Sequence, residues 1–225
     1  RMDAVGERGG ANGNGQGPPL AVTVWGKYAC FTRPENKVER VSYPVMTPSA
    51  ARGVLEAVFW KPEFDWLITR IWLIRPPEWV SMTKNEVKSR ASLRRPRIDV
   101  TEDRVQRPSL FLRDVEYVIF ARPLLRAHAT EPVAKYRDQL RRRVERGSFF
   151  SPPYLGLREL TASFGPVSVE SLRPAELTLP VGPMSLDLGY DADGSTNPEF
   201  FNASIVDGVL DVPVPRRMGG TDAAR

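Results

Sequence analysis

The chain has 225 residues, of which 41% are hydrophobic and 26% are charged, and this composition is typical of a folded globular domain. No apolar run is long enough to cross a bilayer, and the first residues lack the apolar core of a secretory signal. A single cysteine, Cys30, excludes an internal disulfide, so we expect a cytoplasmic protein with no membrane partner.

Positive charge is concentrated in one part of the chain. Residues 84–146 contain 17 Lys or Arg and 9 Asp or Glu, whereas the whole chain has a formal net charge of only +5. A single run of charge is most often a solvated face. Concentration of the whole excess in one region instead favours a nucleic-acid-binding surface, because phosphate neutralisation supplies most sequence-independent affinity.

The spacing of apolar residues predicts six elements between two disordered ends, 1–19 and 214–225. In chain order we predict a strand over 20–25, a helix from Pro48 to just before Pro62, strands over 67–74 and 115–121, a helix from Pro132 to Gly147, and a strand over 157–164. The helices are marked by apolar stripes at helical spacing, Ala51, Val54, Leu55 and Val58 in the first and Val133, Tyr136, Leu140 and Val144 in the second.

This order predicts an α+β protein with a ferredoxin-like, RRM-like domain (βαββαβ) over residues 20–165. The connection from Pro76 to Asp114, between the second and third strands, is long and basic, so we expect a functional insertion there. Residues 166–213 contain short apolar runs separated by Pro and Gly. They predict a small C-terminal antiparallel β-sheet appendage.

Metal chemistry has little support in the residue types present. Histidine occurs once, as His128, so no His/Cys cluster can form with the single cysteine. Asp187, Asp191 and Asp193 lack the spacing of an EF-hand, and we interpret them as a solvated turn. We therefore expect no metal and no other cofactor.

One reaction on RNA needs neither a metal nor a nucleophilic side chain. The 2′-hydroxyl of RNA can attack the neighbouring phosphate if the protein moves two protons and stabilises the charged intermediate. Lys135 and Tyr136, at the start of the second predicted helix, are candidates for this work. The helical spacing alone favours the plainer interpretation, in which Tyr136 is core and Lys135 is solvated.

A series of short motifs follows one another along the chain. They are Trp25–Thr32, Val41–Pro44, Thr47–Gly53, Phe59–Pro62, Asn85–Lys88, Gln106–Arg107, Asp114–Ile119, Lys135–Arg137, Tyr154–Glu159 and Val206–Pro213. Together they resemble the fifth family of CRISPR-associated (Cas) proteins in its "d" variant, from subtype I-C. The resemblance implies a RAMP-superfamily endoribonuclease that cuts precursor CRISPR RNA at the repeat hairpin without metal. It also implies that the protein stays on the 5′ handle within the Cascade complex.

The resemblance implies a catalytic set at Phe59, Lys135 and Tyr136. At the first position the family has a tyrosine, whereas Phe59 has no hydroxyl, and Tyr136 replaces a family histidine. The residues expected to bind RNA are Tyr28, Lys61, Lys84, Lys88, Arg90, Arg94, Arg95, Arg107, Arg141, Arg142 and Arg158. The expected partners are CRISPR RNA and the backbone and large subunits of Cascade, with target DNA as a further candidate.

Two other functions remain open at this point. The protein could be a non-catalytic subunit that caps the 5′ handle of CRISPR RNA, or a basic protein that binds nucleic acids without specificity.

Overall fold

Six strands form one antiparallel sheet in the computed structural model, which describes residues 18–36, 38–89, 97–168, 172–190 and 196–219. Its strands are β1 (Leu20–Ala29), β2 (Phe64–Leu73), β3 (Glu78–Val87), β4 (Arg104–Leu125), β5 (Ser163–Pro166) and β8 (Val209–Asp211). Their order is β5–β1–β4–β2–β8, and β3 pairs with residues 104–113 of β4. The molecule is thus a mixed α/β protein with mostly antiparallel strands and few helices.

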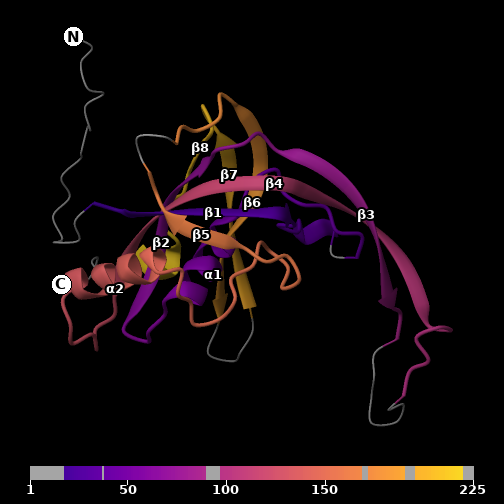
Figure 1. The fold of residues 1–225 in the computed structure, drawn as a ribbon, viewed down its shortest axis with the longest axis horizontal. Coiled ribbons are helices and arrows are strands. Elements are labelled where there is room, and N and C mark those ends of the chain that lie inside the picture. The colour runs from indigo at the N-terminus through magenta and orange to yellow at the C-terminus, as the bar shows by residue number, and fades with distance from the viewer. Residues whose placement is uncertain (1–17, 37, 90–96, 169–171, 191–195, 220–225) are drawn as a thin grey trace.

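Two helices lie on the same side of this sheet, α1 (Pro48–Val58) and α2 (Val133–Glu145) (Figure 1). The predicted start of α1 is confirmed, since the amide of Ala50 donates to the Thr47 side chain at 3.3 Å and caps the helix. The end of α2 is confirmed too, because Gly147 follows it with a φ of +63°, a conformation that glycine adopts without strain.

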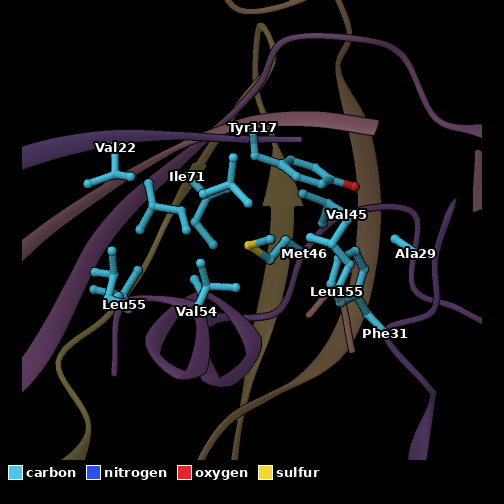
Figure 2. Close-up of a cluster of buried hydrophobic side chains, with 14 of the residues drawn as sticks. Val22, Ala29, Phe31, Val45, Met46, Val54, Leu55, Ile71, Tyr117 and Leu155 are labelled. Atoms are coloured by element: carbon cyan, nitrogen blue, oxygen red, sulfur yellow. The ribbon is translucent and has the colours of Figure 1, made fainter. Parts of the chain in front are cut away.

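The core fills the space between α1 and the sheet. Figure 2 shows Val54 and Leu55 of α1 facing Val22 of β1, Ile71 of β2 and Tyr117 of β4. All five side chains are almost completely buried. Burying each such apolar side chain contributes about 1.5–3 kcal/mol, so the stripe predicted from helical spacing is what fixes α1 against the sheet.

The segment between Pro76 and Asp114 differs from the predicted long loop. It contains β3 and the first half of β4, which pair from Glu78↔Arg113 to Val87↔Arg104 as one long hairpin arm. Figure 1 shows this arm extending away from the body of the molecule. Side chains on β3 alternate between exposed and half-buried, so no fully apolar face marked the strand in the sequence.

The fourth predicted strand, over 157–164, overlaps only the start of β5. Most of the segment is instead a loop, and just before it the carbonyl of Leu155 accepts a hydrogen bond of 3.1 Å from the amide of Cys30, directly after β1. Gly156, directly before the predicted strand, has a φ of +88° and forms a turn there. A Cβ at Gly156 would lie 2.0 Å from the carbonyl oxygen of Cys30, so no larger residue fits the turn.

The predicted C-terminal appendage contains a two-stranded antiparallel sheet made of β6 (Leu179–Tyr190) and β7 (Thr196–Ile205). β6 contacts α1, and β8 then returns to the main sheet beside β2. The tail that we predicted to be disordered contains a short helix, α3 (Arg216–Gly219), because Met218 is buried there.

The interpretation of Asp187 as part of a solvated turn is wrong. Asp187 lies on β6 and is almost completely buried, and its carboxylate is 2.5 Å from the guanidinium of Arg52 on α1. A buried carboxylate needs such a partner, since leaving its charge unpaired away from water is very costly. Asp191 and Asp193, the other members of that predicted turn, lie outside the described residues.

Candidate functional site

An aromatic cluster joins the end of α1 to the start of α2. Phe64 of β2 lies at its centre, with ring centroids 5.4 Å from Phe59, 4.9 Å from Trp66 and 5.0 Å from Tyr136. The indole nitrogen of Trp66 donates to the carbonyl of Phe59 at 2.9 Å, which holds the segment after α1 in place. Two positions of the expected catalytic set, Phe59 and Tyr136, are therefore in one cluster although they are far apart in the sequence.

Both of these side chains are buried. Phe59 is almost fully enclosed, and Tyr136 has no exposed surface. Burial raises the pKa of Tyr136, and the nearby carboxylate of Glu63 raises it further. The tyrosine hydroxyl therefore keeps its proton at neutral pH, so Tyr136 cannot act there as the base that removes a proton from RNA.

Cationic side chains surround the cluster on its outside. The ammonium of Lys61 is 3.8 Å from the Glu63 carboxylate and 5.8 Å from the centre of the Tyr136 ring. Lys135, in the first turn of α2, is exposed, and its ammonium is 2.5 Å from a carboxylate oxygen of Glu131. Both lysines can approach a phosphate, because neither is enclosed by the core.

His128 belongs to the same surface, although no local sequence pattern places it there. Its Nε2 is 3.0 Å from the carbonyl of Pro62, in the segment that follows α1. A carbonyl only accepts hydrogen bonds, so Nε2 is the donor and Nδ1 is left to accept a proton. Histidine is the side chain that most often moves protons in acid–base catalysis. The close approach of two distant loops, which no local pattern encodes, is the signal that identifies it.

The cations predicted to bind RNA on the hairpin arm are partly engaged by carboxylates. Lys84 pairs with Glu159, and the guanidinium of Arg107 is 3.1 Å from the Glu86 carboxylate. Lys84 lowers the pKa of Glu159, chiefly through their hydrogen bond, so this carboxylate stays charged to lower pH. Lys88 is exposed and has no ion pair within the described part of the chain.

The other predicted RNA-binding residues are spread over several surfaces. Tyr28 is half-buried on β1, and the ammonium of Lys27 is 5.6 Å from its ring centre. Arg158 is exposed in the loop before β5. Arg90, Arg94 and Arg95 lie outside the described residues.

The arginine run on α2 divides between surface and structural roles. Arg141 and Arg142 are exposed and contact Asp138, Arg141 through its carboxylate at 3.0 Å and Arg142 through its main-chain carbonyl at 3.3 Å. Arg143 instead donates to the carbonyl of Val58 at 2.9 Å, and its guanidinium lies 5.4 Å from the ring centre of Phe59. Arg143 therefore links α2 to the end of α1.

The described residues contain neither a metal site nor a membrane-crossing helix. No group of three or more His, Cys, Asp or Glu in this part of the chain is arranged to hold a metal ion. Among the same residues, no helix has the length and the apolar character that a membrane crossing requires.

Solved structures with a similar fold include one described as a CRISPR-associated protein, with 20% identity, a TM-score of 0.65, and coverage of 91% of this chain and 94% of that one. A functionally uncharacterized protein from Streptococcus mutans, SMU1763c, is similar at 18% identity and a TM-score of 0.64, with 91% and 95% coverage. These likenesses establish a shared fold.

Sequence relatives extend the comparison. A protein of Thermus thermophilus named CRISPR pre-crRNA endoribonuclease Cas5d is 44% identical over 214 residues, covering 88% of this chain and 92% of its own. A protein of Mannheimia succiniciproducens with the same name is 38% identical, covering 86% and 94%. The model of the family described as CRISPR-associated protein (Cas_Cas5), in its Cas5d form, matches residues 20–212. The chain therefore belongs to the Cas5d family of CRISPR-associated proteins.

Proposed function

We propose that this protein is an endoribonuclease that cuts precursor CRISPR RNA at the repeat hairpin and then stays on the 5′ handle in the type I-C Cascade complex. The observation that carries the proposal is the close likeness, over nearly the whole chain, to two proteins named as pre-crRNA endoribonucleases. The concentration of Lys and Arg between residues 84 and 146 supports a polyanionic substrate.

The body of the protein is, in this proposal, a ferredoxin-like RAMP domain. In a βαββαβ chain of that kind the first and third strands are central, and the fourth and second lie outside them. The observed order β5–β1–β4–β2 follows this arrangement when β4 is taken as the third strand and β5 as the fourth. The position of both helices on one side of the sheet supports the same assignment (Figure 1).

The chemistry that we propose is attack by the RNA's own 2′-hydroxyl without a metal ion. The 2′-oxygen bonds to phosphorus and the bond to the 5′-oxygen breaks, so the products carry a cyclic phosphate and a 5′-hydroxyl. A base takes the proton of the 2′-hydroxyl, and an acid returns a proton to the leaving 5′-oxygen. We assign the stabilisation of the charged phosphorane to Lys135, assisted by Lys61, because both ammonium groups are accessible beside the cluster.

The proton transfers need a group other than Tyr136 as the base. His128 is the candidate, because Nε2 donates to the carbonyl of Pro62 and Nδ1 remains able to accept a proton. Tyr136, which keeps its proton, is left with a structural role or with that of a hydrogen-bond donor.

The proposed partners are CRISPR RNA and the backbone and large subunits of Cascade, with target DNA as a further candidate. The hairpin arm formed by β3 and β4 supports this assignment, because it extends from the body (Figure 1) and alternate side chains of β3 are exposed. A free arm of this kind offers a neighbouring subunit a large surface.

A second function has its own support. Phe59 has no hydroxyl, and Tyr136 is fully enclosed, so two positions of the family's catalytic set are without an accessible proton donor. This favours a non-catalytic subunit that holds the 5′ handle of CRISPR RNA.

Incubation of the purified protein with its cognate repeat RNA in EDTA separates the two functions. The enzyme makes one defined cut, and Lys135→Ala and His128→Ala each slow it by about 10²-fold or more without loss of RNA affinity. Arg75→Ala is the matched control, since Arg75 is exposed and pairs with Glu116 away from the cluster. Tight binding of the hairpin with no cut by the unaltered protein would establish the non-catalytic role.

A further inference from the structure

Two hollows lie along the outer side of α1. The first, of about 570 Å³, lies between the start of α1, the end of β1 and β7. The second, of about 650 Å³, lies between the end of α1 and the loop that follows α2. Gly53 and Tyr154 line both hollows, so together they form one groove that follows the helix, named here the α1 groove.

Exposed aromatic rings line the α1 groove along its length. Phe150 is 80% exposed and Trp60 is 51% exposed, and Tyr154 and Phe200 are also exposed. The loop that carries Phe150 is fixed, because the amides of Phe150 and Ser151 both donate to the carbonyl of Ala57, at 2.8 and 3.1 Å. The structure thus holds a large apolar ring in water, as proteins do at surfaces that bind a partner or ligand.

Gly53 gives the groove an open floor. Glycine weakens the interior of a helix relative to alanine, so its presence in the middle of α1 calls for a reason. A Cβ built on Gly53 meets no atom within 4 Å, so packing within the protein does not require glycine there. The space above the helix backbone is therefore available to a ligand that lies in the groove.

Each of the two hollows is lined by an arginine. Arg33 lines the first hollow, and its guanidinium is 4.5 Å from the ring centre of Tyr43 and 3.7 Å from a carboxylate oxygen of Glu35. Arg158 lines the second hollow, is exposed, and has no ion pair within the described part of the chain. The carboxylate in this hollow, Glu56, is 3.6 Å from the guanidinium of Arg52, which also pairs with Asp187.

We propose that the α1 groove binds an unpaired stretch of the RNA substrate. Its bases stack on Trp60, Phe150 and the other exposed rings, while Arg33 and Arg158 contact its phosphates. Aromatic rings combined with cations are the means by which proteins hold single-stranded nucleic acids. The inference rests on the proposed function and adds to it the place where the single-stranded flank of the repeat lies. The groove ends at Trp60, directly before Lys61 of the candidate cleavage site.

Binding of two labelled RNAs tests this assignment. One is an unpaired oligoribonucleotide of about ten nucleotides, and the other is the cognate repeat hairpin without any unpaired flank. Phe150→Ala and Trp60→Ala should each weaken binding of the unpaired RNA by about fivefold to a hundredfold and leave hairpin binding within about twofold. Trp25→Ala is the matched control, because Trp25 is similarly exposed on β1 but lines neither hollow.

Gly53→Gln gives a second, independent reading. The new side chain fills the open floor, so unpaired RNA should bind more weakly while the unfolding midpoint of the protein does not fall. A purely structural role for the glycine would lower the midpoint instead, and that result would overturn the argument from the open floor.

Three outcomes would overturn the proposal itself. The first is that both variants keep their affinity for the unpaired RNA, and the second is that they lose affinity for the blunt hairpin to the same extent. The last is that RNA binding is unaltered but the variants no longer bind a neighbouring Cascade subunit. The last outcome would show that the groove takes a protein. Because binding is read on uncleaved RNA, the result is separate from the cleavage assay, and either claim can fail without the other.

Discussion

Replacing Arg52 by Met tests the idea that a buried ion pair attaches the C-terminal hairpin to α1. The guanidinium of Arg52 is 2.5 Å from the carboxylate of Asp187, whose side chain is only 2% exposed. Removing one partner of a buried pair takes away the main compensation of the other charge and destabilises a protein by about 3–5 kcal/mol. Arg52 keeps some contact with water, so we expect a loss near the lower end, about 3 kcal/mol.

For a protein of this size, a loss of about 3 kcal/mol lowers the midpoint of thermal unfolding by roughly 6–12 °C. The matched control is Arg70→Met, which removes an arginine from the exposed pair with Asp211, joined at 2.9 Å. An exposed pair contributes about 1 kcal/mol or less. Calorimetry of both variants decides the matter. Equal losses, or a loss below about 1 kcal/mol for Arg52→Met, would refute the reasoning.

Three further predictions concern the stability of the fold. Gly156→Ala should lower the unfolding free energy measured in urea by at least about 1–3 kcal/mol, because its Cβ would meet the carbonyl of Cys30 in a left-handed backbone; an unchanged midpoint would contradict the turn. Gly53→Ala should raise the unfolding free energy by about 0.5–1 kcal/mol in the same assay, and a loss would show an unseen packing conflict. Burial raises the pKa of Tyr117 and Tyr136, so above about pH 10 the folded protein binds more protons than the unfolded one and stability falls as the pH rises. In an absorbance titration both phenols should therefore ionise together with unfolding, and ionisation of the intact fold would contradict their burial.

The sequence predicted the elements whose signals are local. The start of α1 at Pro48, the apolar stripe of α1 and the glycine after α2 each leave a mark within a few residues, and the structure confirms all three. The hairpin arm leaves no such mark, because the side chains of β3 alternate only between exposed and half-buried. The sequence of β3 therefore has the pattern expected of a long loop.

Some residues of the candidate site are likewise predicted by local sequence, and others are not. Lys135 and Tyr136 were predicted from motif and helix position, and their place at the start of α2 follows from local sequence. The position of His128 beside Pro62 and the pairing of Asp187 with Arg52 depend on contacts between segments that are distant along the chain. The charge pattern alone could not reveal which cations are already paired, as Lys84 and Arg107 are.

The measurement that tests the central claim most directly compares two versions of the cognate repeat RNA in EDTA. One is all ribose, and the other carries a single 2′-deoxy nucleotide at the cleavage position. The account predicts one cut in the first RNA, with a 5′-hydroxyl on the downstream product, and no cut in the second, although both bind equally well. Cleavage of the 2′-deoxy RNA, or cleavage that appears only when a divalent metal is added, would contradict it.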